Sequence, residues 1–333
     1  MPGKNRQVIL IEKPQDKLSL ANFALSEAEM PSPAEDEVLV KTRYISLDAA
    51  NRAWMQGVTY RSALNTGEVM AGGALAEVVE SRVDHLAPGD LVNAETGWQE
   101  YAAVPARRLE KLPKLEPLTH LLSVYGVTGL TAYLGLLRVG DPKPGETVVV
   151  SAAAGAVGSI AAQVAKLKGA RVIGIAGGAE KCAWLTGDLG FDVALDYKAG
   201  NLRRALREAA PDGVQVYFDN VGGDVFEAVL FNMANHGRIV CCGAVSQYDG
   251  APPQHGPRGV PGLIVTKRLK VEGFVVMDFY DGRDAALAQL RAWVEAGQLK
   301  VHEDVVDGFE NLPAALIGLL AGENRGKRMV KVG

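Results

Sequence analysis

Residues 147–158 read TVVVSAAAGAVG and lead directly into SIAAQVAKLKG. An apolar strand, a turn of small residues and a helix are predicted in that order. A dinucleotide pyrophosphate needs this arrangement, because small residues let the backbone approach it and free N–H groups at a helix N-terminus meet its charge. Ala153 takes the first place of the usual G-x-G-x-x-G pattern, and Gly155 and Gly158 take the others. The loop predicts a Rossmann fold; a glycine- and alanine-rich site for helix packing is the alternative.

Strand-like runs alternate with helical spacing on the C-terminal side of this loop, which predicts a doubly wound parallel sheet. The runs are TVVVS, RVIGIAG (171–177), DVAL (192–195), VQVYFDN (214–220), GRIVCCG (237–243) and a sixth, LKVEGFVVM (269–277). An amphipathic helix is expected over 283–296, with Leu287, Leu290 and Val294 on its apolar side.

Residues 8–113 have a different pattern of short β-rich runs separated by Gly, Pro and Asp, which predicts an all-β, barrel-like domain. The runs are QVILIE, EVLVKTRYISLD, ALAEVVES, DLVNAE and WQEYAAVP. The last stretch, from Val301, returns to strand, short helix and strand, and we expect it to pack back on the first domain. The predicted division is a discontinuous β-barrel domain of residues 1–125 and 297–333 and a Rossmann domain of residues 126–296.

The length and charge of the chain indicate which kinds of ligand and partner we expect it to bind. The chain has 333 residues, a formal net charge of −4 and 48% hydrophobic residues, and this length suits two domains. So weak a net charge gives no general attraction for nucleic acid or an anionic membrane, so we expect neither partner and a small-molecule ligand. The N-terminus lacks a signal-peptide pattern, and three cysteines, of which Cys241 and Cys242 are adjacent, suit a reducing compartment, so we expect a cytoplasmic protein.

The end of the second strand of the Rossmann sheet indicates which cofactor is bound. A carboxylate there would hold the ribose hydroxyls of NAD, but residues 175–178 read IAGG. Without the acid a phosphorylated ribose is tolerated, and Lys181 follows as a candidate counter-charge. We therefore expect NADPH; the alternative for Lys181 is an ordinary solvated helix lysine.

The residues typical of zinc catalysis and of a nucleophilic serine are missing from the sequence. Residues 1–125 contain no cysteine, and their histidines, His85 and His120, have no second ligand at short spacing. A G-x-S-x-G nucleophile elbow is also missing. Hydride chemistry carried by the cofactor is the simplest expectation, with no metal.

Several longer motifs occur together along nearly the whole chain. They are GVTGLTAYLGLL, AAAGAVGSIAAQVAKLKG, Glu180-Lys181, Asp196-Tyr197-Lys198, YFDNVGG, Gly237-Arg238-Ile239, CGAVSQY, GFVV, GFENLPAAL and GENRGK. With these motifs the chain resembles the medium-chain dehydrogenase/reductase superfamily, and within it the zinc-independent leukotriene/prostaglandin reductase group that includes plant alkenal double-bond reductases and bacterial curcumin reductases. The resemblance implies a GroES-like catalytic domain, a Rossmann domain with NADPH in the cleft, and a homodimer.

The resemblance also implies which residues hold the cofactor. It assigns the diphosphate to Gly155, Ala156, Val157 and Gly158, and the adenosine 2′-phosphate to Lys181 and Tyr197, with Gly178 replacing a serine of the family. Beside the rest of the cofactor it assigns Asn220, Cys242, Gly243, Ala244, Val245, Ser246, Tyr248, Phe274, Val275, Val276 and Asn324.

Tyr248 is the predicted catalytic residue. When hydride reaches the β-carbon of an enone, negative charge develops on the carbonyl oxygen, and a phenol can donate a hydrogen bond or a proton to it. The alternative is that Tyr248 only packs against the nicotinamide.

The chain departs from the family at residues 48–52, where Asp-Pro-Tyr-Met-Arg is replaced by Asp-Ala-Ala-Asn-Arg. Because that tyrosine lines the substrate pocket in relatives, its replacement by Ala50 is expected to reshape the pocket. The residues expected to line it are Ala50, Asn51, Trp54, Tyr60 and Trp98.

The activity implied by the resemblance is NADPH-dependent reduction of the carbon–carbon double bond of an α,β-unsaturated aldehyde or ketone. An NADPH quinone oxidoreductase uses the same fold and cofactor and is the main alternative. A secondary-alcohol dehydrogenase is disfavoured without zinc, and a non-catalytic NADPH-binding protein is the alternative outside the enzymes.

Overall fold

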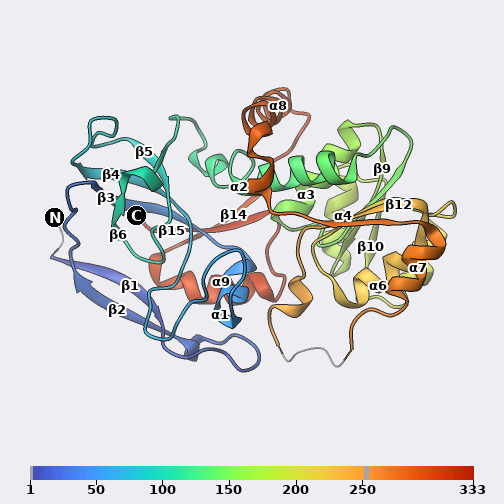
Figure 1. Cartoon of the computed structure of the whole chain (residues 1–333), viewed down its shortest axis with the longest axis horizontal. Helices are drawn as coiled ribbons and strands as arrows, with labels where there is room; N and C mark the ends of the chain where they lie inside the picture. Colours follow the sequence, from blue (N-terminus) through green and yellow to red (C-terminus); the bar gives the residue numbers. More distant parts are fainter. Residues whose placement is uncertain (1–2, 251–254) are drawn as a thin grey trace.

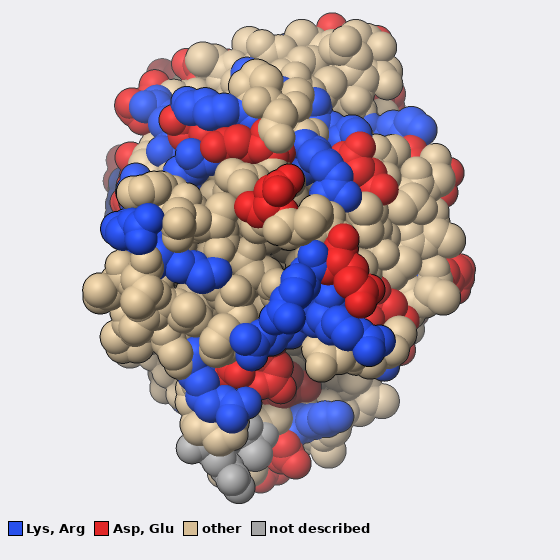
Figure 2. All heavy atoms as spheres, turned by 90° about the vertical axis from the view of Figure 1, so that its right-hand side faces the viewer, with Lys and Arg blue, Asp and Glu red and all other residues tan. Residues whose placement is uncertain are grey.

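The computed structural model describes residues 3–250 and 255–333 as two lobes (Figure 1). Both chain ends lie in the lobe drawn on the left, and the strands of the second lobe lie on the right. Charged side chains of both signs are mixed over the end face of the second lobe (Figure 2). Within the described residues, no helix is long and apolar enough to cross a membrane.

The first lobe is built on a seven-stranded sheet that joins the two ends of the chain. Its strands follow the order β14-β15-β3-β4-β5-β7, with β6 paired to β3. They are β3 (Glu37–Ser46), β4 (Ala74–Ser81), β5 (Leu91–Ala94), β6 (Tyr101–Pro105), β7 (Glu110–Lys111), β14 (Glu303–Asp307) and β15 (Lys327–Lys331). A separate hairpin pairs β1 (Lys4–Leu10) with β2 (Phe23–Glu29).

The C-terminal strand β15 pairs antiparallel with β3, with Val330 opposite Ile45. Val330, Ile45, Val8 and Leu10 belong to one buried cluster, together with residues of α9 (Leu312–Leu320). This pairing supports the discontinuous first domain that we propose; its boundaries at residues 125 and 297 stay a prediction.

The second lobe is a six-stranded parallel sheet in the order β10-β9-β8-β11-β12-β13, which is the Rossmann arrangement. The strands are β8 (Thr147–Val150), β9 (Arg171–Ala176), β10 (Val193–Asp196), β11 (Val214–Asp219), β12 (Met233–Cys241) and β13 (Lys270–Gly273). Successive strands are connected by α3 (Ala156–Leu167), α4 (Ala179–Gly187), α5 (Leu202–Ala209), α6 (Gly223–Asn232) and α7 (Val260–Lys267), whereas α2 (Val127–Leu134) precedes β8 and α8 (Arg283–Glu295) follows β13. Val148, Val149 and Val150 are all fully buried, because both faces of a parallel sheet are covered. The predicted fold class is confirmed.

Two details differ from the prediction. The sixth strand ends at Gly273 instead of running to Met277, because Phe274 turns out of the sheet and its ring packs where a Cβ at Gly135 would stand. A short helix, α1 (Ala50–Gln56), occupies part of the first lobe in which only strands were expected. Its residues Trp54 and Met55 are buried, so tertiary packing stabilises this short helix.

Candidate active site

The glycine loop joins β8 to α3 at the carboxyl edge of the parallel sheet. A Cβ at Gly158 would overlap the carbonyl oxygen of Ala152 and lie 2.9 Å from the carbonyl carbon, so only glycine fits there. Gly155 precedes α3 and has no side chain that could cap the helix. The first N–H groups of α3 have no acceptor within the helix, which makes its N-terminus suited to an anion.

A buried carboxylate, Asp219, shapes the neighbouring turn after β11. Asp219 is 2% exposed and accepts hydrogen bonds from Tyr217 Oη at 2.6 Å and from Ser151 Oγ at 3.0 Å. It also accepts from the backbone N–H groups of Val221 and Gly222, each at 3.0 Å. Sequence reasoning missed Asp219, although an acid between an apolar strand and a Gly-Gly turn was a usable signal.

Asn220 follows on this turn and lies against the glycine loop. Its Nδ2 donates to the carbonyl oxygen of Ser151 at 2.7 Å, and its own carbonyl oxygen accepts from the N–H of Val245 at 3.1 Å. The backbone N–H groups of Cys242 and Gly243 donate to the carbonyl oxygen of Asp219. The predicted run 242–246 therefore lies along the predicted Asn220 turn.

Tyr248 ends this run and turns back on it. Its phenol oxygen accepts a hydrogen bond from the backbone N–H of Ala244 at 3.1 Å, so the phenol proton is free to be donated elsewhere. Burial raises the pKa of the Cys242 thiol to about 12, so this thiol is protonated at neutral pH and contributes no charge beside the phenol.

Two of the predicted phosphate-site residues, Gly178 and Tyr197, lie at the end of β9. A Cβ at Gly177 would stand 2.9 Å from both the Tyr197 ring and the Lys198 side chain, so these two side chains cover the point at which the second strand ends. Gly178, next along the chain, has a φ of +96°. Lys198 was not among the predicted site residues, although it belongs to one of the quoted motifs.

Lys181 makes further contacts besides the counter-charge role that we predicted, which stays a prediction. Its Nζ donates to the carbonyl oxygens of Gly322 and Asn324, at 2.7 Å each. Partial burial lowers the pKa of Lys181, and the charges of Arg325 and Lys198 lower it further. Lys181 therefore ties down the loop before β15.

That loop lies directly on the glycine loop. The N–H of Gly326 donates to the carbonyl oxygen of Ala154 at 2.8 Å, and Asn324 Nδ2 donates to the carbonyl oxygen of Gly326 at 2.8 Å.

The predicted run Phe274–Val276 follows β13 and divides between two surroundings. Phe274 stacks on Phe279, with ring centroids 5.9 Å apart, whereas Val276 is 5% exposed and packs against Leu130 and Leu134. Within the predicted run Phe274–Val276, the side chain of Val276 is therefore a core residue.

The predicted substrate-side residues separate into two groups. Trp98 is fully buried and stacks on Phe23 at 5.8 Å, so it is a core residue and the prediction that it lines a pocket is wrong. Asn51, 1% exposed, also faces inward: its Oδ1 accepts from the N–H of Asp48 and its Nδ2 donates to the carbonyl oxygen of Ala71. It shapes the turn before α1 and offers no side-chain surface to a ligand.

Two of the other three residues keep access to solvent: Ala50 is half-buried at the start of α1, and Tyr60 is exposed. Trp54 is buried and meets the Tyr60 ring edge to face, with ring centroids 6.3 Å apart. The pKa of the Tyr60 phenol is raised, chiefly by desolvation.

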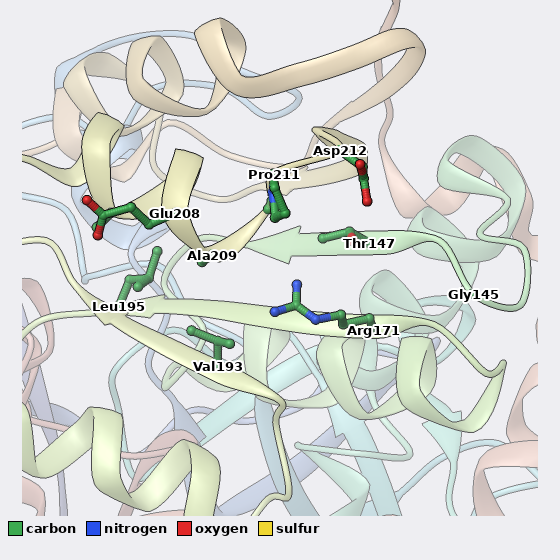
Figure 3. Close-up of a pocket in the computed structure, with 11 residues that line it drawn as sticks. Gly145, Thr147, Arg171, Val193, Leu195, Glu208, Ala209, Pro211 and Asp212 are labelled. Carbon is green, nitrogen blue, oxygen red and sulfur yellow. The ribbon is translucent and has the colours of Figure 1, made fainter.

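A hollow of about 750 Å³ lies elsewhere, between α5 and the strands β8 to β10 (Figure 3). Thr147 and Arg171, which line it, stand at the amino ends of their strands, at the opposite edge of the sheet from the glycine loop. No predicted site residue lines this hollow. In the described parts of the chain, no three His, Cys, Asp or Glu side chains are grouped so that they could hold a metal ion.

Comparisons with known proteins assign the chain to a family. Residues 6–112 match the N-terminal domain of oxidoreductase, and residues 156–292 match the zinc-binding dehydrogenase family. Prostaglandin reductase 1 of Bos taurus is 44% identical over 93% of this chain and 94% of its own length. The NADPH-dependent curcumin reductase of Escherichia coli is 40% identical over 99% of this chain and 97% of its own length.

A solved structure agrees with these relatives. CurA from Vibrio vulnificus, in complex with NADPH, superposes with a TM-score of 0.94 at 39% identity and covers 98% of this chain and 99% of its own. The resemblance found in the sequence is confirmed. The chain belongs to the zinc-independent medium-chain dehydrogenases/reductases of the prostaglandin and curcumin reductase group.

Proposed function

We propose that this protein uses NADPH to reduce the carbon–carbon double bond of an α,β-unsaturated aldehyde or ketone. The hydride goes to the β-carbon, and Tyr248 assists at the carbonyl oxygen. The observation that carries the role of Tyr248 is its hydrogen bond: the phenol oxygen accepts from the N–H of Ala244, which leaves the phenol proton to donate. The family of NADPH-dependent relatives supports the choice of cofactor and substrate class.

The residues present fit NADPH. The close approach at Gly158 and the uncapped N-terminus of α3 suit a diphosphate. The 2′-phosphate would lie among Lys181, Tyr197 and Lys198, of which the two lysines carry positive charge. When bound, the dihydronicotinamide supplies the hydride.

The remaining work belongs to the residues of this chain. As negative charge develops on the carbonyl oxygen, the phenol O–H of Tyr248 stabilises it with a hydrogen bond that strengthens in the transition state. The N–H of Ala244 donates to the same phenol oxygen and stabilises the negative charge that the phenol acquires if it gives up its proton. Trp54 and Tyr60 supply apolar walls that help to exclude water.

The test of this proposal is Tyr248→Phe, which removes the hydroxyl and keeps the ring. We expect turnover of a 2-alkenal or cyclic enone to fall about tenfold or more, which is about 1.4 kcal/mol of transition-state stabilisation. NADPH affinity, measured by fluorescence titration, should not change. Tyr44→Phe on β3 is the matched control, and unchanged turnover in Tyr248→Phe would contradict the proposed role.

A product analysis separates enone reduction from quinone reduction. Purified protein and NADPH are incubated in parallel with a 2-alkenal, a cyclic enone, a diarylheptanoid and a quinone. We expect saturated aldehyde or ketone from the enones. Turnover confined to the quinone would favour the quinone oxidoreductase alternative, and tight NADPH binding without any turnover would favour the non-catalytic one.

We also propose that the protein is a cytoplasmic homodimer. The edge strand β13 has one unpaired side, and Val271 on β13 and Val265 on α7 are 38% and 72% exposed. A second copy that paired with this edge would cover both. The three cysteines are free thiols, which suits a reducing compartment. Light scattering after gel filtration tests the dimer.

A further inference from the structure

Two successive residues in the segment that follows β12, Tyr248 and Asp249, are held by the first lobe. Gln56, on α1, donates from Nε2 to the carbonyl oxygen of Tyr248 at 2.9 Å. Arg52, one turn earlier on the same helix, donates from Nε to Asp249 Oδ1 at 2.9 Å. The same carboxylate oxygen accepts from the N–H of Leu18 at 2.8 Å. The chain is therefore fastened to the first lobe immediately after the Tyr248 ring, at the Tyr248 carbonyl and at the Asp249 side chain.

The pair formed by Arg52 and Asp249 is a largely buried one. The side chain of Arg52 is 2% exposed and that of Asp249 is 18% exposed. Arg52 Nη2 donates to the carbonyl oxygen of Asp16 at 2.9 Å, and Nη1 has no hydrogen-bond partner among residues 3–250 and 255–333. Asp249 is the carboxylate that neutralises this buried guanidinium. Loss of one partner from a buried pair is costly, so the charge of each residue holds the other in place.

The phenol end of Tyr248 is held less firmly. Its described hydrogen bond is the single one from the N–H of Ala244, which belongs to the same turn of chain. Nothing in that local bond prevents the whole turn from moving relative to the first lobe. The contacts from Arg52 and Gln56 fix the position of the turn relative to α1, the helix that also carries Ala50 and Trp54. The contact from Leu18 joins the same turn to the first lobe.

We propose that Arg52 and Asp249 are a positioning pair for Tyr248: their ion pair across the two lobes sets the distance between the phenol and the substrate. This inference rests on the proposed function of Tyr248. Neither residue needs to touch the substrate, because a shift of the phenol by about 1 Å is enough to cost turnover. The pair also gives Arg52 a role in a stretch whose three middle residues, 49–51, differ from the family: Arg52 binds the segment that carries Tyr248 and does not line the pocket.

The experiment is a double-mutant cycle between Asp249→Ala and Tyr248→Phe. If Asp249 acts through Tyr248, Asp249→Ala lowers kcat about tenfold in the wild-type background and by less than about twofold in the Tyr248→Phe background. The NADPH dissociation constant, from fluorescence titration, stays within about twofold in both backgrounds. Asp281→Ala is the matched control, because Asp281 also pairs with an arginine, Arg138, but at the exposed surface.

Other outcomes overturn the inference in distinguishable ways. An equal loss in both backgrounds would mean that Asp249 supports the fold and not Tyr248, and no loss at all would also refute the positioning role. If Tyr248→Phe alone keeps full turnover, the proposed function of the phenol fails and this inference fails with it. If Asp249→Ala does not reach the wild-type melting temperature, Asp249→Asn, which keeps the side-chain volume, replaces it in the cycle. The criterion stays the same: the loss of kcat must be larger in the wild-type background than in the Tyr248→Phe background.

Discussion

The glycine loop and the segment around α1 face the same site but are built by opposite means. Around the glycine loop the constraint is steric and local: Gly158 is pressed against the backbone of Ala152, six residues earlier in the chain. Around α1 the constraint is electrostatic and long-range: Arg52 reaches Asp249, 197 residues away, and Lys327 reaches Asp48, 279 residues away.

The difference teaches which side of the site tolerates change. At Gly158 no side chain fits without displacing the loop, so the cofactor side tolerates little change. Around α1 the buried pair of Arg52 and Asp249 holds the helix in place, whereas Ala50 is half-buried and offers room for a larger side chain. The altered stretch Asp48–Arg52 lies on that side.

The largest effect is expected from adding one methyl group at the steric side, in Gly158→Ala. The new Cβ meets backbone atoms of Ala152 and Ala153, which cannot move without displacing the loop. Overpacking of this kind costs about 1–3 kcal/mol, so the NADPH dissociation constant should rise about tenfold to a hundredfold. Gly187→Ala at the end of α4, where a Cβ meets nothing within 4 Å, should leave it unchanged; equal affinity in both variants would contradict the steric account.

The same contrast explains how much could be predicted from the sequence. The Rossmann lobe was predictable because its signals are local: an unbroken apolar strand, a glycine turn and a helix within 147–167. Helix α1 was missed because it is seven residues long and its N-cap, Ala49, offers no capping side chain. Its position depends on contacts that a local pattern does not contain.

Trp98 and Asp249 show most clearly what a local sequence pattern cannot predict. A tryptophan in a β-rich segment suits a core and a pocket wall equally, and only its stacking on Phe23, 75 positions earlier in the sequence, decides for the core. Asp249 looks like an ordinary turn residue, and nothing near it in the sequence indicates Arg52. Contacts between lobes are set by the whole fold, so this half of the site had to be read from the structure.

An intermediate effect is expected from the two lysines at the end of β9. Lys198 packs over Gly177 beside Tyr197, whereas Lys181 is already bonded to Gly322 and Asn324. Lys198→Ala should therefore weaken NADPH about fivefold to tenfold and NADH hardly at all, since a surface-exposed lysine contributes about 1 kcal/mol to a phosphate.

Lys181→Ala should weaken both cofactors, because it also releases the loop that lies on the glycine loop. The measurement is the ratio of NADH to NADPH dissociation constants for wild type and both variants. A larger change of this ratio in Lys181→Ala than in Lys198→Ala would show that Lys181 is the main phosphate ligand, as first predicted from the sequence.

The smallest effect is expected on the substrate side, from Ala50→Tyr. Ala50 and Trp54 are four residues apart on α1 and so share one helix face. A tyrosine at residue 50 would extend over the space beside Trp54 and Tyr60 without entering the core, so stability and NADPH affinity should not change. The ratio of kcat/KM for a diarylheptanoid to kcat/KM for a small 2-alkenal should fall about threefold to tenfold, since a pocket wall discriminates by about 1 kcal/mol per added group. Ala288→Tyr, on the exposed face of α8, controls for adding a tyrosine to a helix surface. An unchanged ratio would mean that substrates do not pass over the start of α1 and that the divergent wall of the pocket lies elsewhere on the first lobe.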